Sequence, residues 1–554
     1  MPKLLWISQF NLHDSSSGAA KHCKALLEQL AKRGVNILAI GGFVFDSIAG
    51  AKSTFPKLEA EVQQDAAKKP PIALEQNGIN YLYIPTSTTS LSLLPHDEEW
   101  RIYTAFCRQL NIFRPDVCMG YGMALFGTAV HAECKRRGIP HAYPICNGNH
   151  PYYNFWDSDL LFTDSAANAQ LYAQRDHLNL ATTGAFIDKD AYIADSGSHE
   201  YITMINPEPR KGGSIFAKLA LKAKNDPELK NEKFLVVNSR GNFGSTVSVL
   251  HDGDDKEAKN YKPEMFDNVR MTQNTTNMKA IYALTKVLLA PSVPKAWYEG
   301  WGRVASEAVL NRIPVLVAKN GGLEEAMAGA GIALDVPSTL HDDPARMPSD
   351  EEIAPWLEAL KQLLKAKIPG TPVIAPTPSL RGVSEANDEA IPLKMPEFRQ
   401  KSPSLRNSVI AREQSKGSNL IQLTETPVIA SEAKQSHSTP ENPIQNSENS
   451  SLRGVSEAND EAIPLKIPPV IASEQSERGN LTQEPKQFTF DEWKAAESTE
   501  WQARFDEAAR LLDIGRSTDR TMAMLEPLFA KRASQNPHIM LKGQLRFGFD
   551  GNPY

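Results

Sequence analysis

The segment LLAPSVPKAWYEGWGRVASEAVLNRIPVLVAKNGGLEEAMAGAG, residues 288–331, is the most informative part of this 554-residue chain. The apolar run Val287–Ala290 predicts a buried strand, and the spacing of apolar residues in Arg303–Leu310 predicts an amphipathic helix. A second apolar run, Pro314–Ala318, predicts the next strand. Short buried strands that alternate with helices are typical of right-handed βαβ units and parallel sheets.

The same alternation occurs twice along the chain. The first set has expected strands at 3–8, 36–40, 117–120, 141–146 and 160–163 and helices at 19–32, 125–137 and 166–175; the second begins with strand 201–205, helix 214–222, strand 234–238 and helix 278–284. The expected fold class is therefore α/β, with two doubly wound Rossmann-like domains, 1–200 and 201–366, facing each other across a cleft. Because ligands bind beyond the carboxyl ends of parallel strands, we expect the site in that cleft.

Residues 367–487 differ in composition from the rest of the chain. They contain one aromatic residue, Phe398, and 14 of the 38 prolines, and Ser379–Lys394 recurs unchanged as Ser451–Lys466. Such a segment cannot bury enough apolar surface to offset the entropy of ordering it. We expect a disordered insertion with internal repeats, with a docking region for a partner as the alternative. Residues 488–554 are expected to supply helices that complete the fold, followed by a tail.

The overall composition excludes several classes of protein. The 60 basic and 66 acidic residues give a net charge of −6, which argues against nucleic acid as a partner. No apolar run approaches the ~18 residues that a membrane span needs. The five cysteines all lie in the first 150 residues without a C-x-x-C pair, which argues against disulfides and a zinc ribbon. We expect a cytoplasmic protein and leave peripheral contact with a membrane open.

The start of the helix at Arg303 is the expected ligand site. Gly302 opens this helix, and the free amides of Arg303 and Val304, at the positive end of the helix dipole, favour a phosphate. Glu299 lies in the preceding loop, and Glu307 lies one turn into the helix. Since carboxylates accept hydrogen bonds from hydroxyl pairs, the two acids suit a nucleotide sugar, which has such pairs on both sides of a diphosphate.

These residues resemble the donor site of retaining glycosyltransferases of the GT-B type, the family 4 group. The resemblance includes the E-x7-E spacing of Glu299 and Glu307, the following E-A-x-x-N-x-I-P-V, and the segment Met204–Gly213 with its lysine. It extends to Val269–Ser292 and to Gly184–Asp188 and covers about 1–366 and 488–530. The resemblance implies that a hexose is transferred with retention from a nucleoside-diphosphate sugar to a glycan, lipid or small-molecule acceptor.

The resemblance also implies a role for individual residues. Glu299 would contact hydroxyls of the transferred sugar, and Glu307 would hold the ribose. Lys211 would offset the diphosphate charge that grows as the leaving group departs, and Arg210 is a neighbouring candidate. The family usually has arginine where Asn206 stands, so the cation pair is incomplete or is completed by Arg210.

Two further residues are expected at the cleft. Gly18 resembles the glycine loop of the first domain, and His150 is a candidate contact for sugar or acceptor. The family needs no metal or cofactor, so we expect none. For each residue a structural alternative stays open: Gly18 as a plain turn, His150 as a structural histidine and the acids and Lys211 as surface groups.

Three other activities also stay open. A glycoside hydrolase uses two carboxylates, a sugar-nucleotide 2-epimerase shares the two-domain fold, and a nucleotide-sugar binding protein would lack catalysis.

Overall fold

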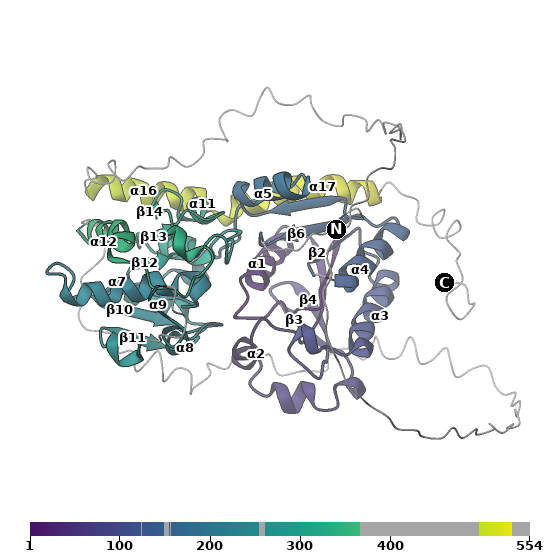
Figure 1. The fold of residues 1–554 in the computed structure, drawn as a ribbon. Helices are drawn as coiled ribbons and strands as arrows, with labels where there is room; N and C mark the ends of the chain where they lie inside the picture. Colours follow the sequence, from purple (N-terminus) through teal and green to yellow (C-terminus); the bar gives the residue numbers. More distant parts are fainter. Residues whose placement is uncertain (123, 149–154, 156, 254–260, 366–497, 534–554) are drawn as a thin grey trace, which may run out of the picture. The chain divides into compact units, whose positions relative to one another are not determined.

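The computed structural model describes residues 1–122, 124–148, 155, 157–253, 261–365 and 498–533 (Figure 1). The segment expected to be a disordered insertion, 367–487, lies outside the described residues, as do His150 and the tail after 533. The described residues form two sheets of mainly parallel strands with helices packed against them. This arrangement confirms the expected α/β class with two Rossmann-like halves.

The first sheet has the strand order β3-β4-β2-β1-β5-β6-β7-β8. Its strands are β1 (Lys3–Ile7), β2 (Asn36–Gly42), β3 (Ile72–Gln76), β4 (Ile79–Ile84), β5 (Val117–Met119), β6 (His141–Ile145), β7 (Leu160–Thr163) and β8 (Ala181–Thr182). All neighbours are parallel except β3 and β4, which form an antiparallel hairpin. The helices of this half are α1 (Gly18–Lys32), α2 (Ile48–Thr54), α3 (His96–Ile112), α4 (Ala124–Arg136), α5 (Ala166–Asp176) and α6 (Lys189–Tyr192).

Strand β1 shows why this sheet is covered on both faces. Leu4 and Trp6 belong to an apolar cluster with residues of α1, whereas Leu5 and Ile7 belong to a second cluster with residues of α3 and α4. Successive side chains of a strand point to opposite faces, so a strand with four apolar residues in a row, Leu4–Ile7, needs a helix layer on each side.

The second sheet has the strand order β11-β10-β9-β12-β13-β14, with every pair parallel. Its strands are β9 (Tyr201–Ile205), β10 (Lys233–Val237), β11 (Val269–Thr272), β12 (Thr285–Ala290), β13 (Val315–Ala318) and β14 (Gly331–Leu334). Its helices are α7 (Gly213–Asn225), α8 (Phe243–Val247), α9 (Met278–Leu284), α10 (Arg303–Leu310), α11 (Leu323–Met327) and α12 (Asp350–Lys365). The sequence order reverses between β9 and β12, which makes the adjoining carboxyl ends a ligand-binding point.

Two late helices, drawn in yellow in Figure 1, join different cores. Helix α16 (Ser498–Leu511) places Trp501 and Phe505 in the core of the second sheet. Helix α17 (Ile514–Ala533) places Leu525 and Phe529 in the α1 side of the first core. Residues far along the chain therefore complete both cores.

The structure differs from the sequence-based prediction mainly in elements that the prediction left out. The β3–β4 hairpin turns at Asn77-Gly78, both with positive φ, and Asn-Gly is a strong hairpin signal. Helix α3 was also absent from the prediction, whereas the predicted strands and helices differ from the observed ones by three residues or fewer at their ends.

Candidate active site

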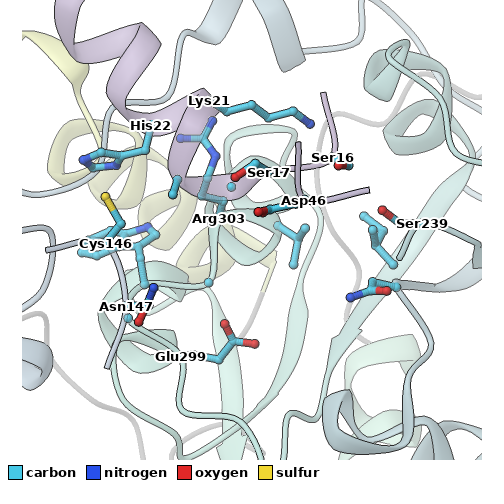
Figure 2. A pocket seen from close by; sticks show the side chains of 18 of the residues that line it. Ser16, Ser17, Lys21, His22, Asp46, Cys146, Asn147, Ser239, Glu299 and Arg303 are labelled. Carbon is cyan, nitrogen blue, oxygen red and sulfur yellow. The ribbon is translucent and has the colours of Figure 1, made fainter. Parts of the chain in front are cut away.

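A pocket of about 440 Å³ is lined by residues that follow the carboxyl ends of strands in both sheets (Figure 2). From the first sheet come residues after β1, β2, β5, β6 and β7, and from the second sheet come residues after β9, β10 and β12. The pocket brings together most of the predicted site residues, namely Gly18, Lys211, Glu299, Gly302, Arg303, Val304 and Glu307. Arg210 is not among its lining residues.

Lys211 and Glu299 form an ion pair inside the pocket. The Lys211 ammonium lies 2.6 Å from Glu299 Oε1, and the Ser292 hydroxyl donates to the same oxygen at 2.6 Å. Burial raises the pKa of Glu299, but the attraction of Lys211 and the hydrogen bonds with Lys211, Ser292 and Trp297 together outweigh it, so the pKa lies below its ordinary value. Burial lowers the pKa of Lys211, and Glu299 offsets this in the opposite direction. These contacts hold both side chains in place in the lining of the pocket.

The ring of Trp297 lies close to three cationic side chains. Its ring lies 4.4 Å from the Arg210 guanidinium, 4.6 Å from the Lys211 ammonium and 5.7 Å from the Arg240 guanidinium. Arg210 is also paired with Glu208. Of these three cations, Lys211 and Arg240 line the pocket.

The backbone at the start of α10 can be approached closely by a ligand. Gly302 has φ +95°, and a Cβ there would lie 2.3 Å from Leu323 Cδ2, so this position requires glycine. No side chain of a described residue caps this end of the helix. The first amides of a helix have no partner within it, so this helix start can bind an anion.

Glu307 is buried in the wall of the pocket at 4 % exposure. Its Oε2 accepts a hydrogen bond from the Tyr282 hydroxyl at 2.7 Å, and its Oε1 lies 3.3 Å from Arg303 Nη2. The Arg303 guanidinium also donates to the carbonyl of Phe186 at 2.8 Å. The carboxylate therefore has a fixed orientation before any ligand binds.

Asn206 lines the pocket and shapes the adjacent loop. It has φ 62°, in the left-handed region that asparagine tolerates better than most residues. Its Oδ1 accepts a hydrogen bond from the Gly241 amide at 2.6 Å. Asn206, at a position where the resemblance implies a cation, thus holds the loop after β10.

The first sheet contributes a buried acid and histidine that the sequence analysis missed. His22 Nδ1 lies 4.0 Å from Asp164 Oδ2, and both residues line the pocket. Burial lowers the pKa of His22 to about 3 and raises the pKa of Asp164 to about 7. Cys23 and Cys146 lie beside them with their Sγ atoms 3.7 Å apart. No local sequence signal marks these contacts, because the residues come from α1 and from the ends of β6 and β7.

Gly18 begins α1 and lines the pocket. Ser17 caps the helix by accepting a hydrogen bond from the Ala20 amide at 3.3 Å. A Cβ at Gly18 would lie 3.8 Å from Arg303 Cδ, so the two helix starts are close.

Neither a metal-binding cluster nor a membrane-spanning helix is seen among the residues that the structure describes. No group of three or more His, Cys, Asp or Glu residues there is placed to hold a metal ion. None of the described helices has the length and apolar character needed to cross a membrane. The absence of a metal requirement stays a prediction.

Comparison with known proteins gave structural likenesses only. No family model matches the chain, and no curated protein matches it. Similar solved structures include sucrose-phosphate synthase from Thermosynechococcus elongatus (13 % identity, 66 % of this chain, 93 % of that chain, TM-score 0.41). A glycosyltransferase from Rickettsia africae is also similar (12 % identity, 66 % of this chain, 93 % of that chain, TM-score 0.42). So is Anabaena HepE in complex with UDP and glucose (14 % identity, 65 % of this chain, 89 % of that chain, TM-score 0.42). The residues of the pocket, rather than these distant likenesses, carry the functional inference.

Proposed function

We propose that this protein is a retaining glycosyltransferase that moves a hexose from a nucleoside-diphosphate sugar to an acceptor hydroxyl. The observation that carries the proposal is the placement of the Lys211–Glu299 pair, the α10 start and Glu307 around one pocket. These groups match, in order, the sugar, the diphosphate and the ribose of such a donor.

The diphosphate fits the start of α10. The amides of Arg303 and Val304 supply donors, and Gly302 leaves room for the phosphates to approach. Lys211 supplies a fixed positive charge beside them. Negative charge grows on the diphosphate as the sugar leaves, and preorganised positive groups at that position lower the barrier.

The two acids fit the two ends of the donor. Glu307 is held by Tyr282 and Arg303, so its remaining lone pairs have a defined direction for ribose hydroxyls. Glu299 is held by Lys211 and Ser292 and would accept hydrogen bonds from the transferred sugar. The E-x7-E spacing, which resembles that of retaining enzymes, supports retention at the reacting carbon.

The acceptor would enter from the first-sheet wall, which contributes His22, Asp164 and Cys146. These residues leave the acceptor class open to a glycan, a lipid or a small molecule. A donor enclosed from water would favour transfer over hydrolysis.

A panel of nucleoside-diphosphate sugars tests the proposal by thermal stabilisation and by turnover. A donor at 100 times its dissociation constant raises the stability of the folded state by about 2.7 kcal/mol. UDP-glucose belongs in the panel first, with the matching GDP and ADP sugars as comparisons. No stabilisation by any member would contradict the proposal.

Product analysis separates the remaining activities. We expect transfer products with the anomeric configuration of the donor, at the same rate with and without a chelator. A 2-epimer formed without acceptor would instead identify an epimerase, and donor binding without any turnover would identify a binding protein.

A further inference from the structure

Lys21 is the feature of the pocket that the proposed function does not use. It lies in the first half of α1, four residues after the capping Ser17, and its side chain lines the pocket (Figure 2). No hydrogen bond or ion pair to another described residue holds its ammonium group. The residue thus brings a positive charge to the wall formed by the first sheet.

The other cations of the pocket are already paired. Lys211 contacts Glu299 at 2.6 Å, Arg303 contacts Glu307 at 3.3 Å, and Arg240 lies 3.6 Å from Asp46. Each of these charges is balanced by the protein itself. Among the lysines and arginines described around the pocket, Lys21 alone lacks such a partner.

The carboxylates nearest to Lys21 do not neutralise it. Glu307 attracts the ammonium, but Arg303, which is paired with Glu307, repels it, and Asp14 is a weaker attraction. Burial is the largest influence and lowers the pKa of Lys21, because the ammonium loses solvating water. An anion in the pocket would restore the lost solvation and would pair with this charge.

We propose that Lys21 binds a phosphoryl group of a ligand in this pocket, from the side opposite to Lys211. The proposal deepens the proposed function, since it assigns a further binding residue to the same site. The phosphoryl group can belong to the diphosphate of the donor or to a phosphorylated acceptor. Both sources present the same chemistry to Lys21, namely an anionic oxygen that accepts charge-assisted hydrogen bonds.

Three variants test the role of the charge. Lys21→Met removes the ammonium at similar size, and Lys21→Arg retains a positive charge. Lys24→Met is the matched control, because Lys24 lies on the same helix, pairs with Glu28 and does not line the pocket. Melting curves of the three variants verify that each is folded.

Calorimetric titration with inorganic pyrophosphate is the first measurement. We expect Lys21→Met to weaken binding at least tenfold, Lys21→Arg to retain part of the affinity and Lys24→Met to leave it unchanged. Equal affinities of wild type and Lys21→Met for every phosphate probe would overturn the proposal, as would the absence of any binding to wild type.

Two further titrations identify whether the phosphoryl group bound by Lys21 belongs to the donor or to a phosphorylated acceptor. Weaker binding of UDP to Lys21→Met would assign Lys21 to the donor diphosphate. Unchanged UDP binding, with weaker binding of glucose 6-phosphate to the UDP-bound protein, would assign it to a phosphorylated acceptor. If wild type binds pyrophosphate through Lys21 but binds no nucleoside-diphosphate sugar, this inference stands and the proposed glycosyl transfer fails.

Discussion

The Lys211 ammonium lies 2.6 Å from Oε1 of Glu299, although 88 positions separate the two residues in the sequence. Lys211 follows β9, and Glu299 lies in the loop after β12, the strand that pairs with β9. The contact therefore follows from the strand order of the second sheet. It sets a positive and a negative group at one end of the pocket before any ligand enters.

Replacing Glu299 by glutamine should slow transfer strongly without abolishing donor binding. Glutamine keeps the size of the side chain and can still contact Lys211 and Ser292, but the negative charge is lost. We expect turnover to fall by about 10²–10³, which is typical for the loss of one preorganised electrostatic group. Steady-state turnover and UDP calorimetry measure the two effects separately.

The control for this variant is Glu358→Gln, an exposed acid on α12 outside the pocket. It should leave both turnover and UDP affinity unchanged. Full activity of Glu299→Gln would exclude a catalytic role for that carboxylate.

Removing one member of the Lys211–Glu299 pair should destabilise the free protein. Each single variant, Lys211→Met or Glu299→Gln, leaves a largely buried charged group without an oppositely charged partner. The loss of one partner of a buried pair costs about 3–5 kcal/mol, and the partial exposure of this pair places the expected loss at the lower end. Denaturant unfolding of both single variants and the double variant measures the loss.

The double variant distinguishes the pair from two independent groups. We expect its loss of stability to be smaller than the sum of the two single losses, because neither charge then remains unpaired. Strictly additive losses would show that the contact contributes no coupling energy.

Tyr282→Phe should weaken nucleoside binding selectively. The variant removes the hydroxyl that donates to Glu307 at 2.7 Å and leaves the apolar packing of the ring in place. We expect the affinity for UDP to fall about tenfold or more, since one hydrogen bond to a charged group contributes about 1.5 kcal/mol or more.

Pyrophosphate affinity is the internal comparison for Tyr282→Phe, and it should stay unchanged because pyrophosphate lacks ribose. Tyr261→Phe is the matched control, since this tyrosine contacts Asp252 outside the pocket. An equal loss of affinity for UDP and pyrophosphate would contradict the ribose role of Glu307.

Asp164 should make stability depend on pH. Burial raises its pKa in the folded state from 3.8 to about 7, so between these values the unfolded chain releases a proton that the folded protein keeps. The contribution of Asp164 to stability is therefore fully present below about pH 4 and is lost as the pH rises to about 7. The loss is at most about 4 kcal/mol, from three pKa units at 1.36 kcal/mol each.

Asp164→Asn should remove this dependence. The stability of the variant minus that of wild type should increase as the pH rises from 4.5 to 7.5. Above pH 7.5 this difference should stay constant. His22 acts in the opposite direction in both proteins, because its pKa is lowered to about 3 and the unfolded chain binds the extra proton. Melting curves across the range measure the difference, and parallel curves would contradict a raised pKa at Asp164.

The parts of the site that the sequence predicted are those that follow from local spacing. Gly302, Glu299 and Glu307 lie within nine residues of one another, and a loop that leads into a helix fixes their relation. Lys211 was predicted from the resemblance and lines the pocket as expected. Its direct contact with Glu299 was not predicted, because it depends on how β9 and β12 pair.

The missed residues depend on tertiary structure. Tyr282 reads as a core residue in the sequence, and its ring is buried, but its hydroxyl contacts Glu307 across two helices. Lys21 and Asp164 carry no motif, and only the packing of α1 and β7 brings them to the pocket. Arg210 adjoins Lys211 in the sequence, yet Arg210 does not line the pocket. Its guanidinium stacks on the ring of Trp297, which does line the pocket.

The placement of Trp501 and Phe529 on the last described helices has a consequence for biosynthesis. Trp501 belongs to the core around β9–β14, and Phe529 belongs to the core beneath β1 and β2. A ribosome must therefore translate beyond residue 500 before either core holds all its side chains. Contacts between residues so distant in sequence also form slowly, so incomplete nascent chains would expose apolar surface to chaperones for much of their synthesis.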